Sequence, residues 1–291
     1  MERQSTYGLL GYPVNHSLSP LMHNAAFEAL EIDAVYKLFS REERELEDFF
    51  SDLKKDTSPI FGLNVTVPYK EKVIPFLDTL SPFAQKTGAV NTITISADRK
   101  LTGQNTDGPG FLSHLDELSV KTEDARVAII GAGGASRAII ASLCLIVERP
   151  ASISLFDIDR DKARILVDDL SSRMDASMVQ VVSSIDDLDI PACDIVMNAT
   201  PIGMKKTDPA LFEPELLNAN QFVYDVIYNP AETTFLSFAK ACGARYSNGL
   251  GMLYFQGVLA FQHWAETQID ERVKMAMREA LEDGLDQSLK R

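Results

Sequence analysis

The sequence predicts an α/β protein with mostly parallel sheets and two domains. Short apolar runs rich in β-branched residues alternate with helical patterns along the whole chain, which is typical of this class. A chain of 291 residues is long enough for two domains, and its 45% of hydrophobic residues is sufficient for two cores. A glycine-rich segment between an expected strand and an expected helix indicates a doubly wound βαβ unit.

The first third of the chain is expected to form an α/β domain of its own. Ser19 and Pro20 are predicted to cap and open a helix that runs to about Leu30, because serine accepts a backbone N–H and proline tolerates the first helical position. Ser81 and Pro82 repeat this pattern. The expected strands of this region are residues 7–10, 35–39, 62–67 and 92–95.

A second pattern begins at Arg126 and indicates a doubly wound parallel sheet. Strand 126–130 enters the glycine cluster, helix 135–147 follows, and strand 153–156 ends at Asp157. Helices of roughly ten residues or more are expected between most of the strands, as in other doubly wound sheets. The later expected strands are residues 179–182, 194–197, 222–226 and 244–246.

The last segment is helical by its periodicity and adds no strand. We therefore expect residues 1–107, completed by helices of residues 249–291, to form one domain. Residues 108–248 are expected to form the other. The chain is predicted to cross between them in two polar, glycine-containing segments, 102–109 and 247–251.

Charge and cysteine content exclude several kinds of partner. The chain has 28 Lys and Arg residues against 42 Asp and Glu, a net charge of −14, which argues against nucleic acids and anionic membranes. Its three cysteines are far apart and lack metal-ligand spacing, so we expect a reducing compartment and no metal site. The N-terminal stretch lacks the pattern of a secretory signal, which favours the cytoplasm. Both a monomer and a homodimer remain open.

The glycine cluster and the acidic residue beyond it predict a dinucleotide site. Glycines such as Gly131 and Gly133 allow the backbone to approach a pyrophosphate, and the N–H groups at the start of the following helix attract its charge. Asp157 ends the next strand, where a carboxylate accepts hydrogen bonds from the ribose hydroxyls of NAD and repels the 2′-phosphate of NADP. NAD is therefore preferred, and Arg160 nearby keeps NADP as the alternative.

Polar residues of the first domain predict a site for a small polyhydroxylated acid. Asn64 and Thr66 alternate onto one face of an extended segment, and Lys70 follows the break at Pro68. With the serines of the NHSLSP segment and the polar runs GAVNT and GQNTDG, these residues offer hydroxyls, amides, one carboxylate and one amine.

Eight ordered motifs resemble those of the shikimate/quinate dehydrogenase family, and they span about Tyr7 to Trp264. The resemblance implies an N-terminal substrate domain, a Rossmann-type cofactor domain and C-terminal helices that return to the substrate domain. It also implies reversible oxidation of shikimate to 3-dehydroshikimate with a nicotinamide cofactor. The motifs are GYPVNHSLSP, NVTVPYK, GAVNT, NTDGPG, GAGGASRA, NATPIGM, DVIYNP and NGLGMLYFQG.

The resemblance also implies residue roles. Lys70 resembles the catalytic lysine of the family and Asp107 its partner. Two groups resemble the residues that bind the substrate and the cofactor. The substrate group is Ser17 and Ser19 for the carboxylate, Asn64, Thr66, Asn91 and Gln256 with Asp107 for the ring, and Tyr228, which closes the site. The cofactor group is Gly131, Gly133, Gly134, Ala135, Asp157, Thr200, Val226 and Gly249.

One departure from the family pattern bears on the cofactor and the substrate. Members that use NADP typically have Asn-Arg-Thr after the second Rossmann strand, where this chain has Asp157, Ile158 and Asp159. This change favours NAD and often accompanies members that act on quinate. The main hypothesis is a shikimate dehydrogenase of aromatic amino acid biosynthesis. The alternatives are an NAD-dependent quinate/shikimate dehydrogenase of quinate catabolism and a non-catalytic nucleotide-binding regulator, against which the intact Lys70 and Asp107 argue.

Overall fold

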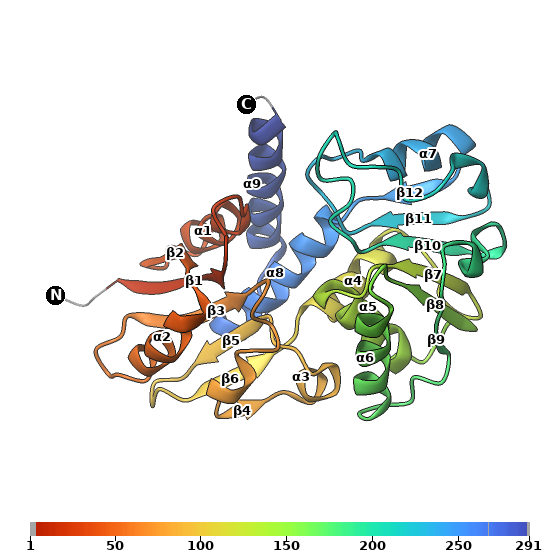
Figure 1. Ribbon diagram of the computed structural model, residues 1–291. Coiled ribbons are helices and arrows are strands. Elements are labelled where there is room, and N and C mark those ends of the chain that lie inside the picture. The colour runs from red at the N-terminus through yellow and green to blue at the C-terminus, as the bar shows by residue number, and fades with distance from the viewer. Residues whose placement is uncertain (1–3, 267, 290–291) are drawn as a thin grey trace. The chain divides into compact units, whose positions relative to one another are not determined.

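The computed structural model describes residues 4–266 and 268–289, and the chain divides into two compact units (Figure 1). Unit 1 contains the chain up to Thr106 and again from Tyr254 onward, and unit 2 runs from Asp107 to Leu253. The ends of the expected first domain, residues 1–3 and 290–291, lie outside the described residues. Within the described residues, no helix has both the length and the apolar character needed to cross a membrane.

Unit 1 is built on a mixed six-stranded sheet with the order β2-β1-β3-β5-β6-β4. β1 is parallel to β2 and β3, whereas β5 is antiparallel to both of its neighbours, so this sheet is less parallel than expected. The strands are β1 (Ser5–Gly11), β2 (Ala34–Ser40), β3 (Ile60–Val65), β4 (Thr79–Leu80), β5 (Thr92–Ile95) and β6 (Leu101–Gln104).

Helices cover both faces of the unit 1 sheet. On one face, Phe50 and Leu53 of α2 join Leu10 and Leu63 of the sheet in one apolar core. On the other, Gly62 of β3 leaves room for the Trp264 indole. Alternation along β3 places Asn64 on this second face. The helices are α1 (Ser19–Ala29), α2 (Leu46–Leu53), α3 (Pro82–Thr87), α8 (Leu250–Ala265), of which unit 1 holds the part from Tyr254, and α9 (Glu271–Leu289).

The two serine-proline pairs begin helices in different ways. Ser81 caps α3 as predicted, because its side chain accepts a hydrogen bond from the Ala84 N–H. Ser19 is not the cap of α1: Leu18 occupies that position, and Ser19 is already helical. The Ser17 Oγ accepts the hydrogen bond of the Ser19 N–H instead, so the side chain that satisfies this helix end lies two residues earlier than expected.

Unit 2 is built on an all-parallel six-stranded sheet with the order β12-β11-β10-β7-β8-β9. Counted from β7, this is the 3-2-1-4-5-6 order of doubly wound dinucleotide-binding domains, with its switch point between β7 and β10. The predicted α/β class is confirmed. The strands are β7 (Arg126–Ile130), β8 (Ser152–Phe156), β9 (Val179–Val181), β10 (Ile195–Asn198), β11 (Phe222–Asp225) and β12 (Arg245–Ser247).

The connections of unit 2 differ from the expected regular alternation. Full helices join β7 to β8, β8 to β9 and β11 to β12, whereas short 3₁₀ turns replace helices around β10. The helices α5 and α6 lie beside each other in Figure 1, and α7 packs on β11 and β12. The helices of unit 2 are α4 (Asp107–Glu117), α5 (Gly134–Leu145), α6 (Arg160–Ser171) and α7 (Thr234–Cys242), and the 3₁₀ turns are η3 (Asp186–Leu188), η4 (Ile190–Ala192) and η5 (Pro214–Leu216).

One expected strand limit is wrong, and one polar segment is more regular than its sequence indicates. In segment 102–109, where a crossing between the domains is expected, residues up to Gln104 belong to strand β6 (Leu101–Gln104) and Asp107 begins α4. Its polar residues concealed a strand that pairs with β5 and β4. Strand 62–67 ends at Val65, because Thr66 starts a turn in which its carbonyl accepts the Tyr69 N–H and Pro68 has no N–H to donate.

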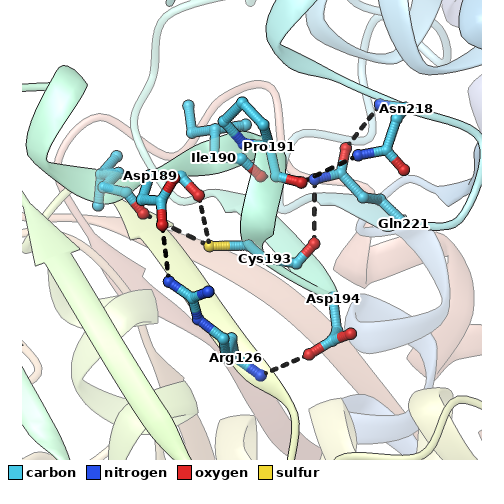
Figure 2. A network of polar contacts seen from close by, with 9 residues as sticks. Arg126, Asp189, Ile190, Pro191, Cys193, Asp194, Asn218 and Gln221 are labelled. Carbon is cyan, nitrogen blue, oxygen red and sulfur yellow. Dashed lines mark hydrogen bonds and ion pairs between the residues drawn. The ribbon is translucent and has the colours of Figure 1, made fainter.

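A polar network ties the segments before β10 and β11 to the amino end of β7 (Figure 2). The buried Gln221 donates from Nε2 to the carbonyls of Ile190 (2.6 Å) and Cys193 (3.0 Å). The backbone N–H of Arg126 donates to an Asp194 carboxylate oxygen at 2.8 Å, and the Arg126 guanidinium pairs with Asp189 at 2.9 Å. At this edge of the sheet, side-chain hydrogen bonds to carbonyls thus hold together segments that are joined by short 3₁₀ turns instead of helices.

Candidate functional site

The two predicted carboxylate-binding serines lie at the start of α1. The Ser17 Oγ donates to the Ser19 Oγ at 3.1 Å, and the Ser19 N–H donates to the Ser17 Oγ at 3.2 Å. Ser17 is half-buried, and Ser19 is 5% exposed. Two adjacent hydroxyls at a helix N-terminus can donate hydrogen bonds to an anion where the helix dipole favours negative charge.

Asn64 lies in a buried hydrogen-bond network on the second face of the unit 1 sheet, the face opposite to α2. Its Nδ2 donates to the Asn91 carbonyl (3.3 Å) and the Thr92 Oγ1 (3.2 Å). Its Oδ1 accepts the Tyr36 hydroxyl proton at 2.8 Å. Burial raises the pKa of Tyr36 well above its usual value, so this hydroxyl remains a donor. No sequence motif marks Tyr36, which alternates within β2 like any other strand residue.

Asn91 and Gln256 meet although 165 positions separate them. The Asn91 Nδ2 donates to the Gln256 Oε1 at 3.3 Å and to the Thr106 Oγ1 at 3.0 Å. The Asn91 Oδ1 accepts the Thr106 N–H at 2.7 Å. Together with Asn64 these amides and hydroxyls form one continuous polar cluster, which is the donor and acceptor set that a polyhydroxylated ring requires.

Thr66 and Lys70 follow β3, the strand that contains Asn64. The Thr66 N–H donates to the Leu10 carbonyl at 2.9 Å, and the Lys70 carbonyl accepts the Val90 N–H at 2.7 Å. The backbone of Lys70 is therefore joined to the loop that leads into Asn91. The Lys70 side chain is half-buried. Asp107 directly follows Thr106 along the chain, is buried, and is the first residue of α4 in unit 2.

The glycine cluster of unit 2 turns between β7 and α5 at the switch point. Gly131 has φ +104°, and a Cβ atom there would lie 2.8 Å from the carbonyl carbon and oxygen of Ala199. Gly133 is the N-cap of α5 and has open space around its missing side chain. Gly134 and Ala135 begin the helix, so their N–H groups belong to the first turn, where no helical acceptor exists. This arrangement fits a pyrophosphate.

Asp157 lies beside this turn, with its side chain 11% exposed. Its Oδ2 accepts the Ala132 N–H at 2.6 Å, and its Oδ1 accepts the Asp159 N–H at 2.9 Å. Each carboxylate oxygen keeps a further lone pair for a ribose hydroxyl. The Lys162 Nζ is 3.8 Å from the Asp157 Oδ2, a cation that the sequence reasoning missed. Lys162 lies in the first turn of α6, and no sequence motif marks a lysine at that position.

Three segments follow the carboxyl ends of β10, β11 and β12. The Thr200 N–H and Oγ1 both donate to the Asn198 Oδ1, at 3.0 and 2.7 Å. The Gly249 N–H donates to the Ile227 carbonyl at 3.2 Å, and a Cβ at Gly249 would lie only 2.0 Å from the Val226 carbonyl oxygen. Tyr228 is half-buried, and burial raises the pKa of its hydroxyl. Ligands of doubly wound sheets bind at this edge.

The part of the chain that the structure describes contains no evident set of metal ligands. No group of three or more His, Cys, Asp or Glu side chains there is arranged to hold an ion. His23, one of the four histidines, is fully buried, with its ring stacked on Tyr36 at 4.5 Å between centroids.

Comparison with known proteins gives a consistent result along the chain. Residues 9–93 match the family model of the shikimate dehydrogenase substrate binding domain. A protein of Geobacillus kaustophilus named shikimate dehydrogenase (NADP(+)) is 40% identical over 283 residues, covering 96% of this chain and 99% of that protein.

Solved structures agree with the sequence relatives. Shikimate 5-dehydrogenase from Listeria monocytogenes, in complex with shikimate and NAD, is 33% identical with a TM-score of 0.85 and covers 96% of both chains. Quinate dehydrogenase from Corynebacterium glutamicum, in complex with NAD, is 31% identical with a TM-score of 0.86 and covers 96% of this chain and 99% of that one.

Proposed function

The chain belongs to the shikimate dehydrogenase family, and from this premise we propose that it catalyses the reversible, nicotinamide-dependent oxidation of shikimate to 3-dehydroshikimate. The observation that carries the proposal is the buried cluster of Asn64, Asn91 and Gln256, which collects from three distant segments the amides that a hydroxylated ring needs. This cluster lies in unit 1, whereas the glycine turn lies in unit 2. Nucleotide binding alone would therefore not explain the cluster.

Most residues proposed for binding and proton transfer belong to unit 1, and one of them, Asp107, is the first residue of unit 2. Ser17 and Ser19 donate hydrogen bonds to the substrate carboxylate, and Thr66, Asn91 and Gln256 bind the ring hydroxyls. Lys70 takes the proton of the C3 hydroxyl during oxidation and returns it during reduction. Asp107 is its partner and orients the ammonium group. Neutral hydroxyls and a helix N-terminus explain how a chain with a net charge of −14 holds an anionic substrate.

Unit 2 supplies the cofactor site, where a bound nicotinamide dinucleotide would accept the hydride. The turn Gly131, Gly133, Gly134 and Ala135 receives the pyrophosphate. Thr200, Val226 and Gly249 line the nicotinamide end, and Tyr228 closes the site from the cofactor side.

We propose that NAD is the preferred cofactor. Asp157 supports this because its two oxygens are already aligned by backbone N–H groups and would face the 2′-phosphate of NADP with like charge. Lys162, 3.8 Å from this carboxylate, is the cation that leaves NADP as the weaker alternative. The Geobacillus kaustophilus relative is named for NADP, whereas both solved structures described above contain NAD, which makes this residue pair the point to test.

The decisive experiment is a steady-state comparison of shikimate and quinate, each with NAD and NADP. We expect the highest kcat/KM for shikimate with NAD. Asp157→Ala should weaken NAD binding and reduce discrimination against NADP. Asp161→Ala, which removes an exposed carboxylate in the first turn of α6, should change neither. A wild-type preference for NADP would refute the cofactor proposal without affecting the reaction.

The same measurements test the second substrate. The structural likeness to an NAD-bound quinate dehydrogenase and the acidic residue at 157 favour quinate as the alternative. Quinate differs by a tertiary hydroxyl at C1, next to the carboxylate that Ser17 and Ser19 would bind. Higher kcat/KM for quinate would assign a catabolic role, and no turnover of either acid would leave only the nucleotide-binding regulator.

A further inference from the structure

A carboxylate with no solvent exposure lies at the carboxyl edge of the unit 2 sheet. Asp225 is the last residue of β11, and its Oδ1 accepts the Asn198 Nδ2 and the Ile227 N–H, both at 3.0 Å. Its Oδ2 accepts the Thr233 hydroxyl proton at 2.6 Å. Three donors from three different segments therefore converge on one side chain.

The network extends beyond Asp225 on both sides. The Asn198 Nδ2 also donates to the Ile202 carbonyl at 3.1 Å, and the Asn198 Oδ1 accepts both donors of Thr200. Every hydrogen-bonding position of this buried amide is in use. Thr233 caps α7, because its Oγ1 accepts the Leu236 N–H at 3.3 Å. One carboxylate thus joins the segment after β10, the segment after β11 and the start of α7.

The sheet itself does not require a charge for this task. Burial raises the pKa of Asp225 to about 6, although its three hydrogen bonds act in the opposite direction. Keeping a charged carboxylate at this position therefore costs folding stability. At the other end of β11, the neutral Gln221 joins the segments before β10 and β11 with two bonds to carbonyls (Figure 2). A neutral amide is sufficient at the edge that faces away from the predicted cofactor site.

The segments that Asp225 joins are those that contain the predicted nicotinamide-end residues. Thr200 is bonded to Asn198, and the Val226 N–H donates to the Asn198 carbonyl at 2.9 Å. Ile227, whose N–H binds Asp225, accepts the Gly249 N–H. A shift of the backbone at Ile227 would therefore move Val226 and Gly249 together.

We propose that Asp225 is a positioning residue for the cofactor: with Asn198 and Thr233, its carboxylate holds the segments after β10 and β11 in the conformation that receives the nicotinamide end of the dinucleotide. This rests on the proposed function only in taking these segments as the cofactor side of the site. Asp225 acts through Thr200, Val226 and Gly249 and does not touch the reacting atoms.

The test measures the dissociation constants of NAD and NADH by calorimetry, without substrate, alongside the melting temperature. Two pairs of variants are compared: Asp225→Asn with Asp225→Ala, and Thr233→Val with Thr233→Ser. We expect Asp225→Ala and Thr233→Val to weaken dinucleotide binding by about tenfold. Asp225→Asn keeps the acceptor for Asn198 and Ile227 and should lose less, and Thr233→Ser, which keeps the hydroxyl, should restore affinity.

Gln221→Ala is the matched control, because it removes buried side-chain hydrogen bonds at the opposite end of β11. It should lower the melting temperature and leave the dinucleotide dissociation constants within about twofold of wild type. In turnover assays Asp225→Ala and Thr233→Val should raise the KM for the dinucleotide far more than the KM for shikimate.

Two outcomes overturn the proposal. Variants of Asp225 and Thr233 that lose melting temperature as Gln221→Ala does, yet bind NAD and NADH like wild type, would make the network structural only. Failure of Thr233→Ser to recover affinity would also contradict it. If Asp225→Ala does not fold, Asp225→Asn and the Thr233 pair decide. Failure of the proposed function can be distinguished from failure of this proposal. If the wild-type protein binds the dinucleotide but does not oxidise shikimate, every binding measurement above can still be made.

Discussion

At the residue scale, the proposed proton transfer depends on one amine, that of Lys70, whose position is set by a backbone hydrogen bond. Lys70 follows the turn after β3, and its carbonyl accepts the Val90 N–H at 2.7 Å. This bond survives any change of the side chain, so substitution removes the amine without removing the turn. The substrate amides of the neighbouring cluster, Asn91 and Gln256, remain hydrogen-bonded to each other.

Lys70→Ala should therefore lower kcat by about 100- to 10,000-fold, the usual contribution of a general acid–base group. The KM for shikimate should change much less, because the hydroxyl-binding residues are untouched. Lys72→Ala is the matched control: Lys72 is two residues away, exposed, and pairs with Glu43. Stopped-flow and steady-state rates of reduced nicotinamide formation measure both. A kcat for Lys70→Ala equal to that of Lys72→Ala would contradict the assignment.

At the element scale, the turn between β7 and α5 contains glycines with two different tasks. Gly131 has a positive φ, and a Cβ there would meet the Ala199 backbone, so the fold itself requires glycine. Gly133 has φ −90° and ψ −173°, an extended conformation open to any residue, with nothing within 4 Å of an added Cβ. The fold does not explain glycine at 133, whereas close approach of a pyrophosphate does.

Gly133→Ala should accordingly leave stability nearly unchanged, with a cost below about 1 kcal/mol at an N-cap position. It should weaken binding of NAD and NADH, because a methyl group would stand where the backbone approaches the phosphates. Gly131→Ala should instead lower the melting temperature. Calorimetric titration and thermal unfolding distinguish the two effects, and unchanged dinucleotide affinity in Gly133→Ala would remove Gly133 from the cofactor site.

Elements with a strong local pattern were predictable from the sequence, and those defined by distant partners were not. Strands 92–95 and 126–130 have the expected limits, because β-branched and apolar runs mark them. β4 has two residues, and the polar β6 is a strand only through its pairing with β5 and β4. Such pairing leaves no trace in a short polar segment.

The candidate site shows the same limit. The motif residues Asn64, Asn91 and Gln256 were named from the sequence, and the structure places them in one cluster. Tyr36 has no motif around it, and Asp225 begins the DVIYNP motif without any role that the sequence assigns, because a buried polar residue in a strand shows its function only when its partner is known. Their partners, Asn64 and Asn198, are 28 and 27 residues away.

At the scale of the whole molecule, each unit contains a buried titratable group, and the two respond to acid in opposite ways. In unit 1, burial lowers the pKa of His23 from 6.5 to about 3, and neither ring nitrogen has a hydrogen-bond partner among the described residues. In unit 2, burial raises the pKa of Asp225 from 3.8 to about 6. His23 is thus folded in its neutral form, and Asp225 is most easily buried when protonated.

For each residue, the direction in which stability changes with pH depends on whether the folded or the unfolded chain binds more protons. The unfolded chain protonates His23 near pH 6.5 and the folded chain does not, so this residue's contribution to stability is complete above that pH and is lost as the pH falls toward 3. Folded Asp225 binds a proton before unfolded Asp225 does, so its contribution is complete below pH 3.8 and is lost as the pH rises through about 6. Each slope reaches about 1.4 kcal/mol per pH unit.

Acidification from about pH 7 to about pH 5 should therefore destabilise unit 1, by about 2 kcal/mol from His23, while unit 2 gains stability from Asp225. Hydrogen exchange measured by mass spectrometry, corrected for intrinsic exchange rates, should show peptides of α1 losing protection before peptides of α5. His23→Leu should abolish most of the loss in α1, because leucine fills a similar volume among the surrounding rings without titrating. Asp225→Asn should remove the gain in α5 and leave α1 unchanged. Equal loss of protection in both helices, or no effect of His23→Leu, would show that other groups control the acid response.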